Sequence, residues 1–303
     1  MIEQILNIQN LSKSYGSIKA LNQLNLTVNR GEIFGILGPN GSGKTTTLGI
    51  ILGVTLPNSG SCTWFGEKPS AYLRTRIGAV LEQPNFYPHL TARQNLRVVA
   101  RIKGVPHSDI MRVLAIVGLE HRADHRFKTF SYGMKQRLAI GAALLGDPQV
   151  LILDEPTNGL DPQGIAEIRE LVIRIASRGI TIIMASHLLD EVQKVCTNVA
   201  VLRTGKLIYT GPVDDMVGET TRLELVAPDM TALHAAISEL DGLNEITVTG
   251  GRLVANFNHK VDPAAVNKAL AEKGIYLSHL ARQHRSLESQ FLELLSNPEK
   301  TKA

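Results

Sequence analysis

Residues 38–45 combine glycines with a lysine and a threonine at the spacing of a phosphate-binding loop. They match G-x-x-x-x-G-K-[ST] and follow the apolar run 33–37. Glycines let backbone N–H groups turn inward around phosphates, and a helix that begins at Lys44 adds its positive dipole end. Lys44 then reaches the β- and γ-phosphates, and the Thr45 hydroxyl binds Mg²⁺. The pattern predicts a nucleoside triphosphate site formed by Gly38, Pro39, Asn40, Gly41, Ser42, Gly43, Lys44, Thr45 and Thr46.

Two carboxylates follow a second apolar run further along the chain. Gln149 to Leu153 has the composition of a buried strand and leads directly into Asp154 and Glu155. The carboxyl ends of parallel strands are where α/β proteins place their ligands. We therefore expect Asp154 to hold Mg²⁺ through its water shell and Glu155 to polarise the water that attacks the γ-phosphate. The alternative, a surface acidic pair that caps the next helix, fits less well directly after a buried strand.

Three more segments occur in an order that is typical of one family. They are 130–137 (FSYGMKQR), 151–161 (LILDEPTNGLD) and 180–187 (ITIIMASH). Together with the loop at 38–45, this order resembles the nucleotide-binding subunits of ABC transporters over roughly residues 5–215. The resemblance implies ATP and Mg²⁺ as cofactors, and ATP hydrolysis that is coupled to transport.

The same resemblance assigns roles to five residues outside the phosphate loop. Tyr15 stacks on adenine, His187 contacts the γ-phosphate, and Asp161 belongs to a loop that crosses a dimer interface. Ser131 and Gly133 face the γ-phosphate that a partner subunit binds, and Ser131 is also a natural helix N-cap. From the residues alone, Tyr15 is equally well interpreted as an ordinary half-buried aromatic. His187 in isolation would more often be a residue at a helix start with no ligand, and its place in the series of motifs is what favours the functional role.

The chain departs from the family at the signature motif and at the glutamine loop. The common signature is L-S-G-G-Q, whereas Tyr132 here replaces a glycine and Met134 replaces the glutamine. This variant resembles bacterial exporters with separate membrane subunits. Counting from Ile77 places the loop's glutamine on Glu82, with Gln83 one residue late. Glutamate there resembles the ABC subunits that handle lantibiotics and bacitracin-like peptides. Because a carboxylate can still bind Mg²⁺ or a water, we expect Glu82 to be a nucleotide and metal ligand, with Gln83 as the alternative register.

Composition is that of a globular chain with more than one domain. The 303 residues are 44% apolar and 20% charged, with a net charge of +4 and scattered basic residues. Cys62 and Cys196 show no metal-ligand spacing and are expected to be small buried hydrophobes. The N-terminal residues do not form a signal peptide pattern. Because no apolar run approaches the ~18–20 residues of a membrane helix, a channel is expected on another chain.

Periodicity predicts an α/β fold with strands 5–9 and 24–28 and a largely helical stretch at about 84–145. The resemblance implies a P-loop NTPase of the ABC cassette type over residues 1–215, in which these parts are an antiparallel flank and, beside a RecA-like core, a helical subdomain. Thr91, Ser108 and Ser131 are the predicted caps of its helices. In the loop 84–90 that precedes these helices, Phe86 and Tyr87 either face a membrane subunit, as the resemblance implies, or pack inward.

Beyond a Gly-Pro break, residues 220–303 have the order β-α-β-β-α-β of a ferredoxin-like α+β domain. Its last predicted strand is 275–280, and a helix is predicted over 286–295. This C-terminal accessory domain carries no catalytic group. Dimer contact, regulation and simple stabilisation are all open as roles.

Three functions compete at this point. The first is an ATPase subunit that drives export, possibly of a peptide antibiotic or drug, through a separate integral membrane permease. Its partners are that permease and a second ATP-binding subunit in a homodimer, with no nucleic acid, at the cytoplasmic face of the cell membrane. The second is a cytosolic ABC ATPase acting on nucleic acid or ribosomes, which lacks support because the chain has neither a coiled coil nor a second cassette. The third, a binding module without turnover, conflicts with the presence of Lys44, Glu155 and His187.

Overall fold

The computed structural model describes residues 3–81, 83–217, 221–283 and 291 of the chain. They form two compact units that divide between Val213 and Asp214. The limits expected from the sequence, 215 and 220, lie a few residues further along the chain. Each unit has its own hydrophobic core.

A six-stranded sheet forms the centre of the larger unit, with the order β5-β6-β7-β3-β8-β9. The strands are β3 (Ile33–Leu37), β5 (Ile77–Val80), β6 (Val150–Asp154), β7 (Thr181–Ser186), β8 (Asn198–Arg203) and β9 (Lys206–Pro212). All neighbours are parallel except β8 and β9. Every residue of β3, β6 and β7 is buried, as expected for strands covered on both faces.

The register of these strands places the expected site residues at one edge of the sheet. Leu37, the last residue of β3, pairs with Ser186 of β7. Asp154, the last residue of β6, pairs with Ala185 of the same strand. The loop after β3, the pair Asp154-Glu155 and the residue after Ser186 therefore leave the sheet side by side.

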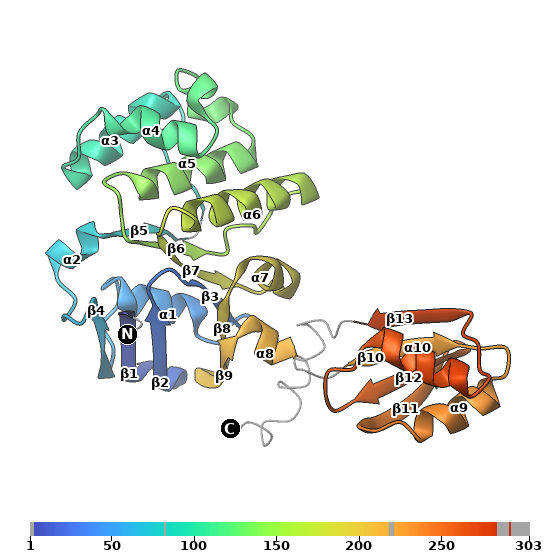
Figure 1. Cartoon of the computed structure of the whole chain (residues 1–303). Helices are drawn as coiled ribbons and strands as arrows, with labels where there is room; N and C mark the ends of the chain where they lie inside the picture. Colours follow the sequence, from blue (N-terminus) through green and yellow to red (C-terminus); the bar gives the residue numbers. More distant parts are fainter. Residues whose placement is uncertain (1–2, 82, 218–220, 284–290, 292–303) are drawn as a thin grey trace. The chain divides into compact units, whose positions relative to one another are not determined.

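A three-stranded antiparallel sheet, in the order β2-β1-β4, flanks this core (blue in Figure 1). Its strands are β1 (Gln4–Tyr15), β2 (Ile18–Asn29) and β4 (Ser59–Trp64). The predicted strands 5–9 and 24–28 are parts of a longer hairpin. α1 (Lys44–Ile51) shares the main core with these strands, and the Trp64 indole N–H donates to the Ile51 carbonyl at 2.7 Å. This contact fixes the helix that follows the phosphate loop.

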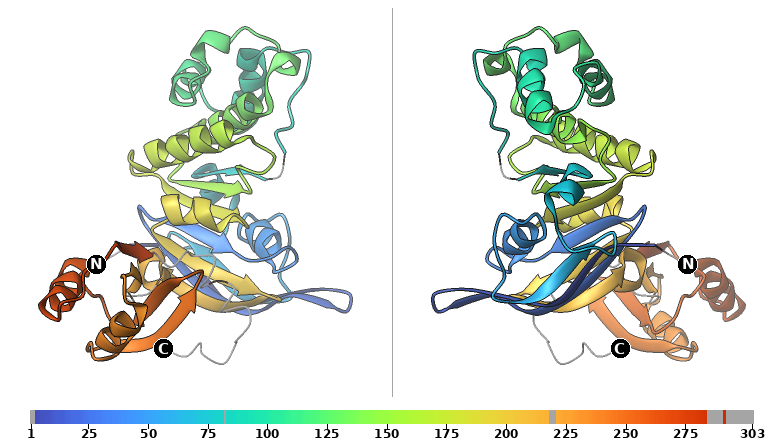
Figure 2. Two further views of the ribbon diagram at one scale, coloured as in Figure 1. Left: turned by 90° about the vertical axis from the view of Figure 1, so that its right-hand side faces the viewer. Right: turned by 90° about the vertical axis from the view of Figure 1, so that its left-hand side faces the viewer.

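The helical subdomain lies at one end of the larger unit (green in Figures 1 and 2). It contains α3 (Ala92–Lys103), α4 (Asp109–Ile116) and α5 (Tyr132–Leu144). Two predicted caps are confirmed, because the hydroxyls of Thr91 and Ser131 accept from the backbone N–H groups of Gln94 and Met134. Ser108 is the residue before α4, as predicted, but its backbone is already helical and its side chain makes no capping hydrogen bond.

The remaining helices of the larger unit connect the strands. They are α2 (Ala71–Thr75), α6 (Pro162–Ala176), α7 (Leu189–Val195), the short 3-10 turns η1 (Glu120–Arg122) and η2 (Phe127–Thr129), and α8 (Val213–Val217), which spans the division. Within the described part of the chain, no helix combines the length and the apolar character that crossing a membrane requires. The two cysteines are buried as predicted, and burial raises the pKa of both thiols.

Lys103 joins two helices of the helical subdomain. It is the last residue of α3, and its ammonium donates to the carbonyls of Ala142, Ala143 and Leu145 at 2.9, 3.0 and 3.2 Å. These carbonyls close α5, where a cation complements the helix dipole. Although the residue as a whole is exposed, partial burial of its ammonium against these carbonyls lowers the pKa of Lys103 to about 8.

Lys103 should therefore make stability depend on pH in the alkaline range. The unfolded chain keeps this proton up to its pKa of about 10.4, whereas the folded chain releases it from about pH 8. Since the unfolded state binds more protons in this window, the stability that Lys103 contributes rises with pH there. Relative to Lys103→Met, the wild type should gain stability between pH 7 and 9.5, by less than the full pKa shift would give because the Lys103 residue is partly exposed to solvent.

The measurement is urea unfolding followed by the fluorescence of Trp64, which is the chain's single tryptophan and is buried in the larger unit. Lys68→Met, at an exposed position, is the matched control and should show no such pH-dependent difference. A constant difference between wild type and Lys103→Met across this range would contradict the prediction.

The smaller unit is a four-stranded antiparallel sheet with the order β11-β12-β10-β13. Its elements are β10 (Arg222–Val226), α9 (Met230–Ser238), β11 (Leu243–Thr249), β12 (Arg252–Phe257), α10 (Pro263–Glu272) and β13 (His279–Gln283). This order confirms the ferredoxin-like prediction. The predicted last strand, 275–280, is wrong in position, because Ile275 and Leu277 pack on the core before the strand begins. The predicted helix 286–295 lies outside the described residues except for Phe291.

Candidate active site

The phosphate loop crosses from the end of β3 to the start of α1 with its lysine turned inward. The Lys44 side chain is only 6% exposed, and its ammonium donates to the carbonyls of Gly38 and Pro39 at 2.7 and 3.4 Å. Gly43, at φ 110°, allows the loop to pass close to β2. A Cβ there would lie 2.6 Å from the Ala20 carbonyl oxygen and 2.7 Å from Leu21 Cδ2. Any other residue at this position would displace the loop.

Thr45 and Asp154 form the oxygen pair that was predicted to bind Mg²⁺. The Thr45 hydroxyl donates to Asp154 Oδ2 at 3.1 Å, and the Asp154 side chain is buried at the end of β6. One hydroxyl and one carboxylate that leave room for water and phosphate oxygens suit Mg²⁺, which usually keeps several waters.

Glu155 contacts both Lys44 and His187 at the carboxyl ends of the parallel strands. Its Oε1 lies 3.6 Å from the Lys44 ammonium, and its Oε2 lies 2.8 Å from His187 Nδ1. The His187 backbone N–H also donates to Oε2, at 3.3 Å. Glu155 has a left-handed backbone, with φ 47°, which costs energy for a residue with a Cβ. Its N–H donates to the Ala185 carbonyl at 2.9 Å, so β7 holds it in this conformation.

A cavity of about 620 Å³ opens in front of these carboxylates. Besides Thr45, Asp154 and Glu155 it is lined by Gln83, Pro84, Asn85, Tyr132 and Asn158. Gln83 therefore lies beside the proposed metal ligands. Glu82 lies outside the described residues, and its assignment stays a prediction. The sequence reasoning had not proposed Asn85, Tyr132 or Asn158 as lining residues. Their closeness in sequence to Gln83, Ser131 and Glu155 is the signal that could have found them.

The loop fits a triphosphate by its unsatisfied groups as well as by its shape. Ser42 is 2% exposed, and its hydroxyl has no hydrogen-bond partner within the described residues. A buried hydroxyl of this kind needs an explanation, and a phosphate oxygen would supply the missing acceptor. Thr46 is half-buried at the start of α1, and Asn40 and Gly41 are exposed at the loop tip.

Ser131, Gly133 and Asp161 are gathered in a different cavity, of about 460 Å³. Ser131 caps α5, and Asp161 caps α6 by accepting from the Gly164 N–H at 2.8 Å. The loop residues Gly159 and Leu160 complete the wall of this cavity. No phosphate-loop residue lines it among the described residues, so the chain holds two separate groups of predicted site residues.

The aromatic residues that the sequence singled out differ in their surroundings. Tyr15 is 49% exposed at the end of β1, with the Lys13 ammonium 5.1 Å from its ring centroid. Its adenine-stacking role stays a prediction. Phe86 packs edge-on against Phe127, with ring centroids 5.2 Å apart, whereas Tyr87 is 54% exposed. Of this adjacent pair, Phe86 therefore packs inward and Tyr87 is exposed to solvent.

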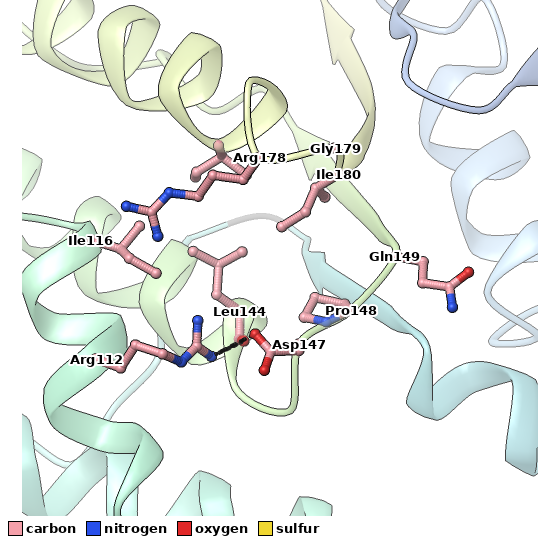
Figure 3. A pocket seen from close by; sticks show the side chains of 10 residues that line it. Arg112, Ile116, Leu144, Asp147, Pro148, Gln149, Arg178, Gly179 and Ile180 are labelled. Carbon is pink, nitrogen blue, oxygen red and sulfur yellow. Dashed lines mark hydrogen bonds and ion pairs between the residues drawn. The ribbon is translucent and has the colours of Figure 1, made fainter.

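Another cavity, of about 260 Å³, lies between α4, the end of α5 and the end of α6 (Figure 3). Its wall includes apolar side chains such as Leu144 and Ile180 and an ion pair of 2.9 Å between Arg112 and Asp147. It contains none of the predicted site residues. The loops that line it precede β6 and β7, so it lies at the edge of the sheet opposite the phosphate loop.

Comparison with known proteins identifies relatives along almost the whole chain. The family model described as ABC transporter matches residues 21–158. The bacitracin transport ATP-binding protein BcrA of Bacillus licheniformis is 39% identical over 297 residues, which cover 96% of this chain and 97% of that protein. The lantibiotic transport ATP-binding protein SrtF of Streptococcus pyogenes is 42% identical over 210 residues, covering 69% of this chain and 92% of its own.

Solved structures match the larger part of the chain. CbiO1 from Clostridium perfringens, part of the ABC transporter complex cbiONQ, superposes with a TM-score of 0.67 at 33% identity. The match covers 72% of this chain and 92% of that one. A dimeric post-hydrolysis structure of the ATP-binding cassette MJ0796, bound to ADP and Pi, has a TM-score of 0.62 at 28% identity. It covers 69% of this chain and 99% of that one.

Proposed function

The chain belongs to the family of ABC transporter ATP-binding proteins and is an ATPase, and we propose that it powers export through a separate membrane permease. The observation that carries the proposal is the contact of Glu155 with both Lys44 and His187, next to the Thr45–Asp154 pair. Phosphoryl transfer requires charge compensation and a positioned water, and these residues supply both.

Each residue then has a role during hydrolysis. Lys44, now bonded to its loop carbonyls, would bind the β- and γ-phosphate oxygens instead, and Thr45 and Asp154 would hold Mg²⁺, which would supply positive charge next to the phosphates. Glu155 accepts a hydrogen bond from the attacking water and orients it. His187 holds the Glu155 carboxylate through Nδ1 and directs the rest of its ring toward the γ-phosphate.

We further propose that two copies of the chain form the ATP sites together. Ser131 and Gly133 line a different cavity from the phosphate loop, so within one copy they do not complete the site. A second copy that faces the first would place its Ser131 and Gly133 on the γ-phosphate. The dimeric form of the related MJ0796 cassette supports this arrangement.

The substrate we propose is a peptide antibiotic or a similar compound, and the place of action is the cytoplasmic face of the cell membrane. The support is the similarity to the bacitracin and lantibiotic transport proteins over most of the chain. The relatives give no support to a cytosolic ATPase that acts on nucleic acid or ribosomes.

Deletion of the gene tests this proposal in cells. The deletion strain should become more sensitive to bacitracin-type peptides or lantibiotics, because export then lacks its energy source. Wild-type chain supplied from a plasmid should restore resistance, whereas Lys44→Ala, expressed to the same level, should not. Unchanged sensitivity to every such peptide would reject the substrate class. Restoration by Lys44→Ala would reject ATP-driven export itself.

A further inference from the structure

Tyr132 stands at the junction of the two cavities that hold the predicted site residues. It is the first residue of α5 and is 37% exposed. It lines the cavity of Thr45 and Glu155 and also the cavity of Ser131 and Asp161. Within the described part of the chain it is the residue that these two cavities share, so it is placed to link them.

The ring of Tyr132 lies beside Gly159. A Cβ on Gly159 would lie 3.5 Å from Tyr132 Cε1 and 4.0 Å from Cζ, so the phenol edge is within the width of one methyl group of this α-carbon. At the next position, a Cβ on Gly133 would lie 3.7 Å from Leu160 Cδ2. Two consecutive residues at the start of α5 thus lie next to two consecutive residues of the loop after Glu155.

That loop is a continuous series of turns that leads back to Glu155. The Asn158 N–H donates to the Glu155 carbonyl at 3.1 Å, and the Leu160 N–H donates to the Thr157 carbonyl at 3.3 Å. At its other end the loop is anchored by Asp161, which caps α6. A displacement at Gly159 is therefore passed toward Glu155, which is already held in a left-handed conformation.

We propose that Tyr132 is a positioning residue that holds the loop 155–161 through Gly159 and so aligns Glu155 of its own chain with the attacking water. The proposal rests on the proposed function, which supplies the second copy that Ser131 and Gly133 engage. Binding of the second copy at Ser131 and Gly133 and alignment of Glu155 are then linked through the side chain of Tyr132. The Tyr132 hydroxyl makes no hydrogen bond within the described residues, so the positioning is assigned to the ring beside Gly159.

Steady-state ATP hydrolysis by the full-length chain tests the role of the ring. Tyr132→Ala should lower kcat by about 10- to 100-fold, because a small misplacement of a catalytic group is costly. KM should change by less than about twofold, since phosphate-loop binding is untouched. Tyr132→Phe keeps the ring and should retain most of the turnover. Tyr72→Ala, at a tyrosine that is 72% exposed on α2, is the matched control.

A second measurement separates this role from direct contact with the partner's nucleotide. In a Glu155→Gln background, which holds ATP without turnover, size measurement with ATP should show the same dimer with and without Tyr132→Ala. Loss of the dimer in the double variant would overturn the proposal in favour of nucleotide contact. Wild-type kcat in Tyr132→Ala would overturn it as well. If Glu155→Gln alone stays monomeric with ATP, the two-copy site fails, while kcat and KM still decide the role of Tyr132.

Discussion

Glu155→Gln should reduce ATP turnover by about 10²- to 10⁴-fold, the range expected when a general base is lost. The amide keeps the size of the side chain and still accepts a hydrogen bond from His187. It lacks the negative charge that polarises the water and balances the Lys44 ammonium at 3.6 Å. ATP affinity should stay near normal, because the phosphate loop supplies most of the binding groups. Phosphate release and binding of a fluorescent ATP analogue measure the two effects separately.

The matched control for this change is Glu170→Gln on α6. Glu170 is exposed, so the same loss of one charge should leave turnover unchanged. The assignment of Glu155 is refuted if Glu155→Gln hydrolyses ATP at the wild-type rate. Loss of ATP binding by Glu155→Gln would instead mean that the carboxylate is needed to hold the phosphate loop for ATP binding and does not act on the attacking water.

Lys44→Ala should have the complementary phenotype, with loss of nucleotide binding itself. The ammonium is 6% exposed and is held by the Gly38 and Pro39 carbonyls, at the position where the β- and γ-phosphates would enter. Its removal deletes a charged hydrogen bond worth about 3 kcal/mol, which weakens affinity about 100-fold or more. Calorimetric titration with ATP and Mg²⁺ measures this loss.

Lys68→Ala, at an exposed lysine, should bind ATP like the wild type. Circular dichroism then checks that Lys44→Ala is folded, so that weak binding is not a result of unfolding. Normal ATP affinity in a folded Lys44→Ala would show that the loop binds triphosphate without its lysine. The ATP-site assignment of residues 38–46 would then have to be revised.

The sequence by itself was sufficient wherever a feature depends on residues that are close along the chain. The phosphate loop is contiguous, so its glycines, Lys44 and Thr45 could be identified from spacing alone. Caps are local too, which is why Thr91 and Ser131 were found. Largely apolar runs indicated β3, β6 and β7, because strands covered on both faces need apolar side chains on both. The differences at Ser108 and at the last strand are also local, since several backbone conformations satisfy the same short pattern.

Only the tertiary structure decided which distant segments meet. The contact of Glu155 with His187 requires β6 and β7 to be neighbours in register, and no local pattern contains that pairing. The bonds of the Lys103 ammonium to the α5 carbonyls depend on how α3 meets α5. The position of Tyr132 beside Gly159 depends on the helical subdomain reaching the loop after β6. Each such contact joins residues far apart in the chain and is selected by the packing of the whole unit, so it appears in the folded structure and not in the order of residues.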